Sequence, residues 1–243
     1  MTKPSIYLID KVTFLSLLRC WVHVTLINLS LTAIGLGIEL GQIDDFDAGV
    51  SANWIWGRDG FGGPVVVADP SVSENAYLET ESFGGEDAPG SRMALINREQ
   101  WTGDFLAAGV SAIRLEAFNG GPNFAFQDMT IRLGFSSELA STGSGRVVTS
   151  QGFPVNRDDG WQQLEFDLND LTPIAGSDPV EVMRSVSEMR IISAEDPLFI
   201  GDQFIARLGV DSITAVPEPS AASHWLGGVI AMFLWFRLQR VSG

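Results

Sequence analysis

Residues 161–168 read Trp-Gln-Gln-Leu-Glu-Phe-Asp-Leu, and this stretch decides the fold class. In an extended strand alternate side chains point to opposite faces, so Leu164, Phe166 and Leu168 would share one face. The two acidic residues between them would share the other. A strand with one apolar and one charged face is typical of a sheet that covers a core on one side and meets water on the other.

Short alternating segments of this kind recur along the middle of the chain, and turn-forming residues separate them. Examples of the turns are Gly62-Gly63-Pro64 and Asn119-Gly120-Gly121-Pro122. One stretch differs, because Asp178 and Pro179 form a helix-start pattern before good helix formers. We therefore predict an all-β sandwich of about nine strands with at most one short helix. The predicted strands cover residues 43–47, 65–68, 77–82, 93–97, 111–118, 124–135, 161–168, 189–193 and 204–215.

Composition removes several classes of function. The chain has 243 residues, and 30 Asp and Glu against 15 Lys and Arg give a net charge of −15. A surface this acidic repels phosphate backbones, so we expect no nucleic-acid partner. A single Cys and two His leave no basis for a disulfide framework, a Cys/His metal cage, or most mechanisms that pair a nucleophile with a histidine.

The N-terminal end has the order of a secretory signal. Lys3, Lys11 and Arg19 precede an apolar run over residues 20–38, and acidic residues follow. We predict a signal peptide over residues 1–38, with cleavage near residues 35–37. The alternative is an uncleaved anchor, because a helix over the apolar run would reach about 28 Å, close to the thickness of a bilayer core. Both interpretations export the chain that follows.

The C-terminal end combines a proline-containing motif, a short apolar stretch and two arginines, in that order. These are Val216, Pro217, Glu218 and Pro219, then residues 225–236, then Arg237 and Arg240. The combination resembles the PEP-CTERM sorting signal of Gram-negative bacteria that make exopolysaccharide and carry an exosortase. The resemblance implies that residues 216–243 form a sorting signal with a hydrophobic helix, and that an exosortase and the secretion machinery are partners. The chain would be anchored in the membrane transiently and then reach the cell surface or the extracellular matrix; a plain tail anchor is the alternative.

The remaining residues, 41–216, form one predicted domain. Its opening motif Asp44-Asp45-Phe46-Asp47 and its closing motif at residues 208–213 resemble those of jelly-roll, galactose-binding-like carbohydrate-binding modules. The resemblance implies a jelly-roll sandwich in which a structural Ca²⁺ ties the first strand to the last. It nominates Asp47 and Asp211 as ligands, and Asp45 would point to the same face as Asp47. The alternative is that all three are solvated carboxylates at strand ends.

Three tryptophans are candidates for sugar contact. Exposed aromatic rings pack against the apolar face of a sugar, while neighbouring acids and amides fix its orientation. Trp54, Trp56 and Trp101 lie beside predicted turns, and the first two would share one face of a strand. That face can equally be the core. We accordingly predict a non-catalytic surface or matrix protein that binds polysaccharide, with a purely structural matrix protein without a ligand as an alternative.

A hydrolase is the other alternative. Residues 164–170 resemble the E-x-D-x-x-E strand of laminarinase-type glycosidases, in which carboxyl groups carry the chemistry. Glu165 and Asp167 would share a strand face about 6.6 Å apart. The third acid is Asp170 rather than a glutamate, which departs from that pattern and puts the activity in doubt.

Overall fold

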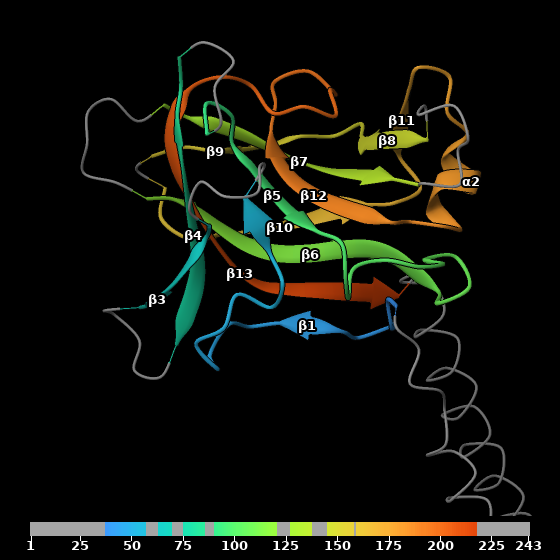
Figure 1. Cartoon of the computed structure of the whole chain (residues 1–243), viewed down its shortest axis with the longest axis horizontal. Coiled ribbons are helices and arrows are strands. Elements are labelled where there is room, and N and C mark those ends of the chain that lie inside the picture. Colours follow the sequence, from blue (N-terminus) through green and yellow to red (C-terminus); the bar gives the residue numbers. More distant parts are fainter. Residues whose placement is uncertain are drawn as a thin grey trace, which may run out of the picture. The chain divides into compact units, whose positions relative to one another are not determined.

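The computed structural model describes residues 37–56, 63–69, 75–85, 90–120, 127–137, 145–157 and 159–217 (Figure 1). Within these ranges the chain forms thirteen strands and one short helix, arranged as two antiparallel sheets. The prediction of a jelly-roll β-sandwich is therefore confirmed. The prediction of about nine strands was too low for these ranges.

The first sheet, here called sheet A, contains six strands in the order β10-β6-β13-β4-β3, and β1 pairs with β13 outside that order. Every pairing in it is antiparallel. Its strands are β1 (Ile43–Asp44), β3 (Val65–Ala68), β4 (Ala76–Phe83), β6 (Val110–Asn119), β10 (Gln162–Asp167) and β13 (Ile205–Pro217).

The second sheet, sheet B, contains seven strands in the order β11-β8-β7-β12-β5-β2, and β9 pairs with β7. The chain passes from sheet A to sheet B and back between β4, β5, β6 and β7, which is how a jelly roll winds (Figure 1). The strands of sheet B are β2 (Ile55–Trp56), β5 (Ala94–Asn97), β7 (Met129–Ser136), β8 (Arg146–Thr149), β9 (Phe153–Val155), β11 (Leu171–Ile174) and β12 (Glu188–Ser193).

The core lies between the two sheets. Leu164 and Phe166 on β10 are buried and belong to the main apolar cluster, whereas Glu165 and Asp167 are exposed, as the alternation predicts. The facing sheet contributes Phe135, which is fully buried. Burying a ring of this size is worth about 2–3 kcal/mol, so these alternating positions supply much of the free energy of folding.

Strands β2, β8, β9 and β11 were not predicted. Each has two to four residues, so a period of two is only weakly visible in it, although the equally short β1, β3 and β5 were predicted. Strand β11 also carries Pro173, and it lies at the edge of sheet B, where a missing N–H is tolerated. The predicted helix is α2 (Pro179–Met183), and the Asp178 carboxylate accepts the N–H of Val180 at 2.9 Å as its N-cap.

Residue Ile38, which precedes the predicted domain of residues 41–216, packs with the sandwich. Ile38, the last residue of the predicted signal segment, is 7% exposed and packs in the main core. Its N–H donates to the carbonyl oxygen of Thr102 at 2.7 Å. Of the predicted signal segment over residues 1–38, residues 1–36 lie outside the described residues, as do Glu218, Pro219, Arg237 and Arg240. Val216 and Pro217 are the last residues of β13.

Across the described ranges, no helix combines the length and the apolar character needed to cross a membrane.

Candidate functional site

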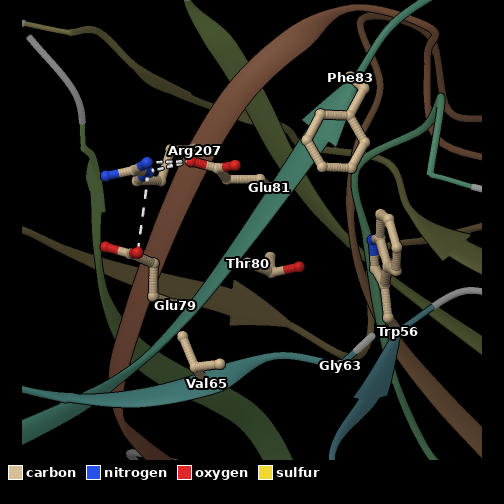
Figure 2. Close-up of a pocket in the computed structure, with 8 residues that line it drawn as sticks. All are labelled: Trp56, Gly63, Val65, Glu79, Thr80, Glu81, Phe83 and Arg207. Atoms are coloured by element: carbon tan, nitrogen blue, oxygen red, sulfur yellow. Dashed lines mark hydrogen bonds and ion pairs between the residues drawn. The ribbon is translucent and has the colours of Figure 1, made fainter. Parts of the chain in front are cut away.

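The outer face of sheet A carries a pocket. On β4, Leu78 faces the core and is fully buried, so Glu79, Glu81 and Phe83 point away from it. The neighbouring strand β13 places Arg207 directly opposite Glu81. The pocket has a volume of about 350 Å³, and Figure 2 shows the side chains around it. Its lining includes Trp56, Val65, Glu79, Glu81, Phe83 and Arg207.

One wall of the pocket is a fixed network of charges. The Arg207 Nε donates to Glu81 Oε1 at 2.5 Å, and Nη2 donates to the same oxygen. The Glu79 carboxylate approaches the same guanidinium, with Oε1 3.7 Å from Nε (Figure 2). Burial alone would lower the pKa of Arg207, but the hydrogen bonds with Glu81 and the charges of both glutamates raise it. Arg207 therefore stays charged and keeps one orientation.

The opposite wall is aromatic. The rings of Trp56 and Phe83 meet edge to face, with centroids 5.8 Å apart and planes at 82° (Figure 2). Phe83 is 61% exposed, and Trp56 is half-buried. Behind the indole lies Gly90, at which a Cβ would come within 2.2 Å of Trp56 Cη2. The glycine leaves the room that the indole occupies, and Trp56 is the predicted sugar-contact tryptophan that lines this pocket.

Trp54 and Trp101 are a correction to the predicted sugar contacts. They are 1% and 0% exposed, so neither ring presents a face to solvent. Both indole N–H groups donate to Asp44 Oδ2, at 2.8 Å and 2.7 Å. Trp54 precedes strand β2, following Asn53 with a φ of 60°, so it does not share a strand face with Trp56. A buried carboxylate needs donors, and these two indoles supply them.

A second aromatic group lies on the same face of sheet A. The centroids of Tyr77, Phe118 and Trp161 are 4.4 to 5.4 Å apart. Phe118 lies over β13 at Gly209, where a Cβ would come within 1.9 Å of its ring. Burial, followed by the charge of Glu79 and a hydrogen bond to it, raises the pKa of Tyr77, so its hydroxyl remains a donor to Glu79 Oε2 at 3.4 Å. Trp161 is 37% exposed and forms the open side of this group.

Sequence reasoning missed most of this face as a site. Phe83 and Trp161 each adjoin a glycine, in Phe83-Gly84-Gly85 and Asp159-Gly160-Trp161. A large aromatic residue beside a turn is the signal that could have singled them out. Glu79, Glu81 and Arg207 carried no such signal, because their meeting depends on the pairing of β4 with β13, two strands far apart in the chain.

The three residues predicted to bind calcium, Asp45, Asp47 and Asp211, have different surroundings. Asp211 is 4% exposed and accepts the N–H of Ser212 at 2.6 Å, and the amide of Asn75 lies 3.5 Å from its other oxygen. Burial raises the pKa of Asp211 to about 6, and the charges of Glu116 and Asp47 add to the effect. Asp47 is exposed and accepts the N–H of Ala76 at 3.0 Å, whereas Asp45 Oδ1 accepts the N–H of Asp47 at 3.4 Å.

The oxygen atoms that these residues offer determine which metal ion they could bind. The part of the chain that the structure describes contains no group of three or more acidic, His or Cys side chains placed to hold a metal. A buried carboxylate with a raised pKa is nonetheless a position where a cation could take the place of a proton. Backbone carbonyls and water would have to complete the oxygen shell of a Ca²⁺ ion held by Asp47 and Asp211.

The predicted hydrolase residues do not line the pocket. Glu165 is bound by Arg114 across β10 and β6, at 2.6 Å from Nη2 and 3.0 Å from Nε. The Asp167 carboxylate accepts both the backbone N–H and the side-chain amide of Asn169. Asp170 is exposed in the turn that follows. These contacts fit a strand with a solvated polar face.

Comparison with known proteins identifies no family for this chain. No protein-family model matches the sequence, and no curated protein matches it. Among solved structures, the family 11 carbohydrate-binding module of a cellulosomal cellulase of Clostridium thermocellum has a TM-score of 0.45 and 14% identity, over 76% of this chain and 96% of the module. A family 28 module specific for non-crystalline cellulose has a TM-score of 0.45 and 15% identity, over 74% and 98%. An exo-β-agarase has a TM-score of 0.48 and 8% identity, over 74% of this chain and 26% of the agarase.

Proposed function

We propose that this chain is an exported, non-catalytic protein that binds polysaccharide through the outer face of sheet A. The observation that carries the proposal is the pocket in which Phe83 and Trp56 stand opposite the Arg207 network. Aromatic rings pack against the apolar face of a sugar ring, and charged groups hydrogen-bond its hydroxyls. Both kinds of group meet here on one exposed surface.

The apolar side of the pocket favours a ligand. Phe83 and Val65 are 61% and 55% exposed, so a large part of their apolar surface is in water. Covering that surface is favourable at about 25 cal/mol per Å². The polar side needs little rearrangement, because Glu81 already holds Arg207 in place. A site ordered in advance loses less conformational entropy when it binds.

The charges of the pocket favour a neutral polysaccharide. Two glutamates share the Arg207 guanidinium, so the polar wall carries more negative than positive charge. The whole chain has a net charge of −15, which also repels polyanions. We therefore place neutral glycans ahead of acidic exopolysaccharides as ligands.

The location and the ion belong to the same proposal. The PEP-CTERM-like signal, with an exosortase and the secretion machinery as partners, would deliver the domain to the cell surface or matrix. Val216 and Pro217, the first two residues of that motif, are also the last two residues of β13. A Ca²⁺ ion at Asp47 and Asp211 would supply positive charge to a joint at which two carboxylates repel each other.

Affinity gel electrophoresis with immobilised glycans tests the binding. We expect wild-type protein to be retarded by at least one neutral polysaccharide, such as a soluble β-glucan, xylan or agarose, and less by alginate. Phe83→Ala should reduce the apparent affinity about tenfold or more, which is about 1.4 kcal/mol. Leu198→Ala is the matched control, because Leu198 is 50% exposed and lies outside the pocket.

Two outcomes would contradict the proposal. Retention that is unchanged in Phe83→Ala would move the site away from this pocket. Absence of retention by any glycan would favour the structural matrix protein without a ligand.

A further inference from the structure

The last strand of the sandwich is held from both sides at its C-terminal end. Strand β6 pairs with β13 as far as Pro217. On the other side, β4 pairs with β13 only as far as Val210. Strand β1 pairs instead with Ile213 and Thr214, at the bulge that lies between Asp211 and Thr214. The neighbour of β13 therefore changes from a long strand to the first strand of the domain.

The residues before β1 extend this pairing. The N–H of Gly41 donates to the carbonyl oxygen of Ala215 at 3.0 Å, and the N–H of Ala215 donates to that of Gln42 at 2.9 Å. Ala215 is 1% exposed. These two hydrogen bonds join the first residues of the domain to nearly the last, so the end of β13 is covered on its second side by residues 41–44.

Contacts outside β13 fix the same segment. Ile38 is buried in the main core, and its N–H donates to Thr102 O at 2.7 Å. The Gln42 side chain donates from Nε2 to Gln100 O at 3.1 Å. A Cβ on Gly37 would lie 3.2 Å from Thr102 O, so the backbone runs close against this loop. The segment is anchored independently of the strand that it covers.

We propose that residues 37–44 are a clamp that protects the end of β13 from proteolysis and so limits how far the C-terminal side of the domain can be trimmed. Proteases cut backbone that has left its hydrogen-bonded partners, so resistance follows local unfolding. With the clamp in place, the backbone is protected as far as Pro217. Without it, the residues after the bulge at Asp211 have only β6 as a neighbour and open first.

Because of the clamp, the position at which β13 is trimmed depends on where the N-terminal side of the domain is cut. A cut that spares Ile38 leaves the clamp anchored, and a cut at or beyond Ile38 removes its buried anchor. The predicted signal cleavage near residues 35–37 falls just before this point. The inference requires neither a glycan nor an exosortase, so it stands or falls separately from the proposed function.

Limited proteolysis of the full chain in detergent micelles tests the clamp, with a broad-specificity protease and the intact mass of the resistant fragment as the readout. The wild-type fragment should begin at or before Gly37 and end at or beyond Pro217. Ile38→Glu puts a charge in the core, so its fragment should end nearer the bulge at Asp211. Ile43→Glu is the matched control, because Ile43 lies on the same segment but is 53% exposed, and its fragment should match the wild type.

Hydrogen exchange separates loss of the clamp from loss of the fold. In Ile38→Glu the amide of Ala215 should exchange at least about tenfold faster than in the wild type, while Val210, which pairs with both β4 and β6, keeps its protection. Ile38→Ala should give a smaller change of the same kind if the glutamate variant does not fold.

Three results would overturn the proposal. The fragments of the Ile38 variants could still end at Pro217, or Ala215 could exchange at the wild-type rate. Equal loss of protection at Val210 and Ala215 would mean that the segment supports the whole sheet rather than the end of β13.

Discussion

Asp44 and Trp101 lie 57 residues apart in the chain, yet the indole Nε1 of Trp101 donates to Asp44 Oδ2 at 2.7 Å in the core. The same oxygen accepts Trp54 Nε1 at 2.8 Å and Gln100 Nε2 at 3.2 Å. One buried carboxylate thus ties the first strand to the residues before β2 and to the loop after β5. The opening acidic motif has a structural role at this position.

Replacing Asp44 should therefore destabilise the domain strongly. Asp44→Ala leaves two buried indole N–H groups without an acceptor, and we expect a loss of about 3–5 kcal/mol in the free energy of unfolding. Asp44→Asn retains an acceptor oxygen and should lose less. Urea unfolding followed by tryptophan fluorescence measures both. Asp45→Ala changes an exposed neighbour, and its free energy of unfolding should stay within about 0.5 kcal/mol of the wild type. If Asp45→Ala is as destabilising as Asp44→Ala, the hydrogen bonds of Asp44 to the indoles are not the cause.

The Arg207 network should contribute to glycan affinity. Glu81→Gln removes the charge that holds the guanidinium in place, so we expect glycan binding to weaken about fivefold to twentyfold with little change in fold. Isothermal titration calorimetry against the glycan that retards the wild type measures this change. Glu165→Gln alters an ion-paired glutamate on the same face but outside the pocket, and its affinity should equal that of the wild type.

Glu165 also provides a test of the hydrolase alternative. Because Arg114 binds Glu165 and Asn169 binds Asp167, we expect no release of reducing sugar from laminarin, mixed-linkage glucan or agarose by wild-type protein. Release that disappears in Glu165→Gln would establish the hydrolase and reject the non-catalytic interpretation.

Stability should depend on pH through Asp211. Its pKa is raised from 3.8 to about 6 in the folded state, so the folded chain binds this proton more tightly than the unfolded chain. The resulting stabilisation is complete below about pH 4 and is lost as pH rises through 6. Asp211→Asn should therefore be more stable than the wild type by about 1–3 kcal/mol at pH 7.5 in EDTA, and equal to it at pH 4.

Thermal unfolding at the two pH values, with and without Ca²⁺, measures this effect. If Ca²⁺ binds at Asp47 and Asp211, it should raise the melting temperature of the wild type at pH 7.5 and leave that of Asp211→Asn unchanged. An equal rise in both proteins would place calcium elsewhere. No rise in either would remove the ion from the proposal.

The packing of Tyr77, Phe118 and Trp161 should require a glycine at position 209. A Cβ at this position would come within 1.9 Å of Phe118, so Gly209→Ala must displace the ring and disturb its contact with Trp161. We expect a loss of about 1–3 kcal/mol and a shift in tryptophan emission. Gly63→Ala is the control, because a Cβ there meets nothing within 4 Å. Equal effects of the two substitutions would contradict the packing described here.

The sequence predicts the parts of this molecule that depend on neighbouring residues. The alternation from Leu164 to Leu168 and the cap at Asp178 both follow from local periodicity and local hydrogen bonding, and both are confirmed. Strands β2, β8, β9 and β11 were missed because alternation over two to four residues is a weak signal, although the equally short β1, β3 and β5 were predicted. Local pattern therefore yields the sandwich but not all of its shortest strands.

The candidate site depends on contacts between distant segments, so it could be predicted only in part. Of the three tryptophans predicted to contact sugar, Trp56 lines the pocket. Trp54 and Trp101 looked equivalent to it in sequence, and only their pairing with Asp44 separates them. Arg207 and Glu81 are 126 residues apart, and nothing local marks them as partners.

The meeting of β1 with β13 has a mechanical consequence. Gly41 and Ala215 are hydrogen-bonded neighbours on antiparallel segments, so the two ends of the domain leave from the same side of the sheet. Tension applied between these ends would first load the buried anchor at Ile38 and then the backbone hydrogen bonds of the seam one after another, rather than all at once in shear. A domain fastened at both ends would open at this seam once Ile38 leaves the core, whereas a domain fastened at one end would carry no load across it.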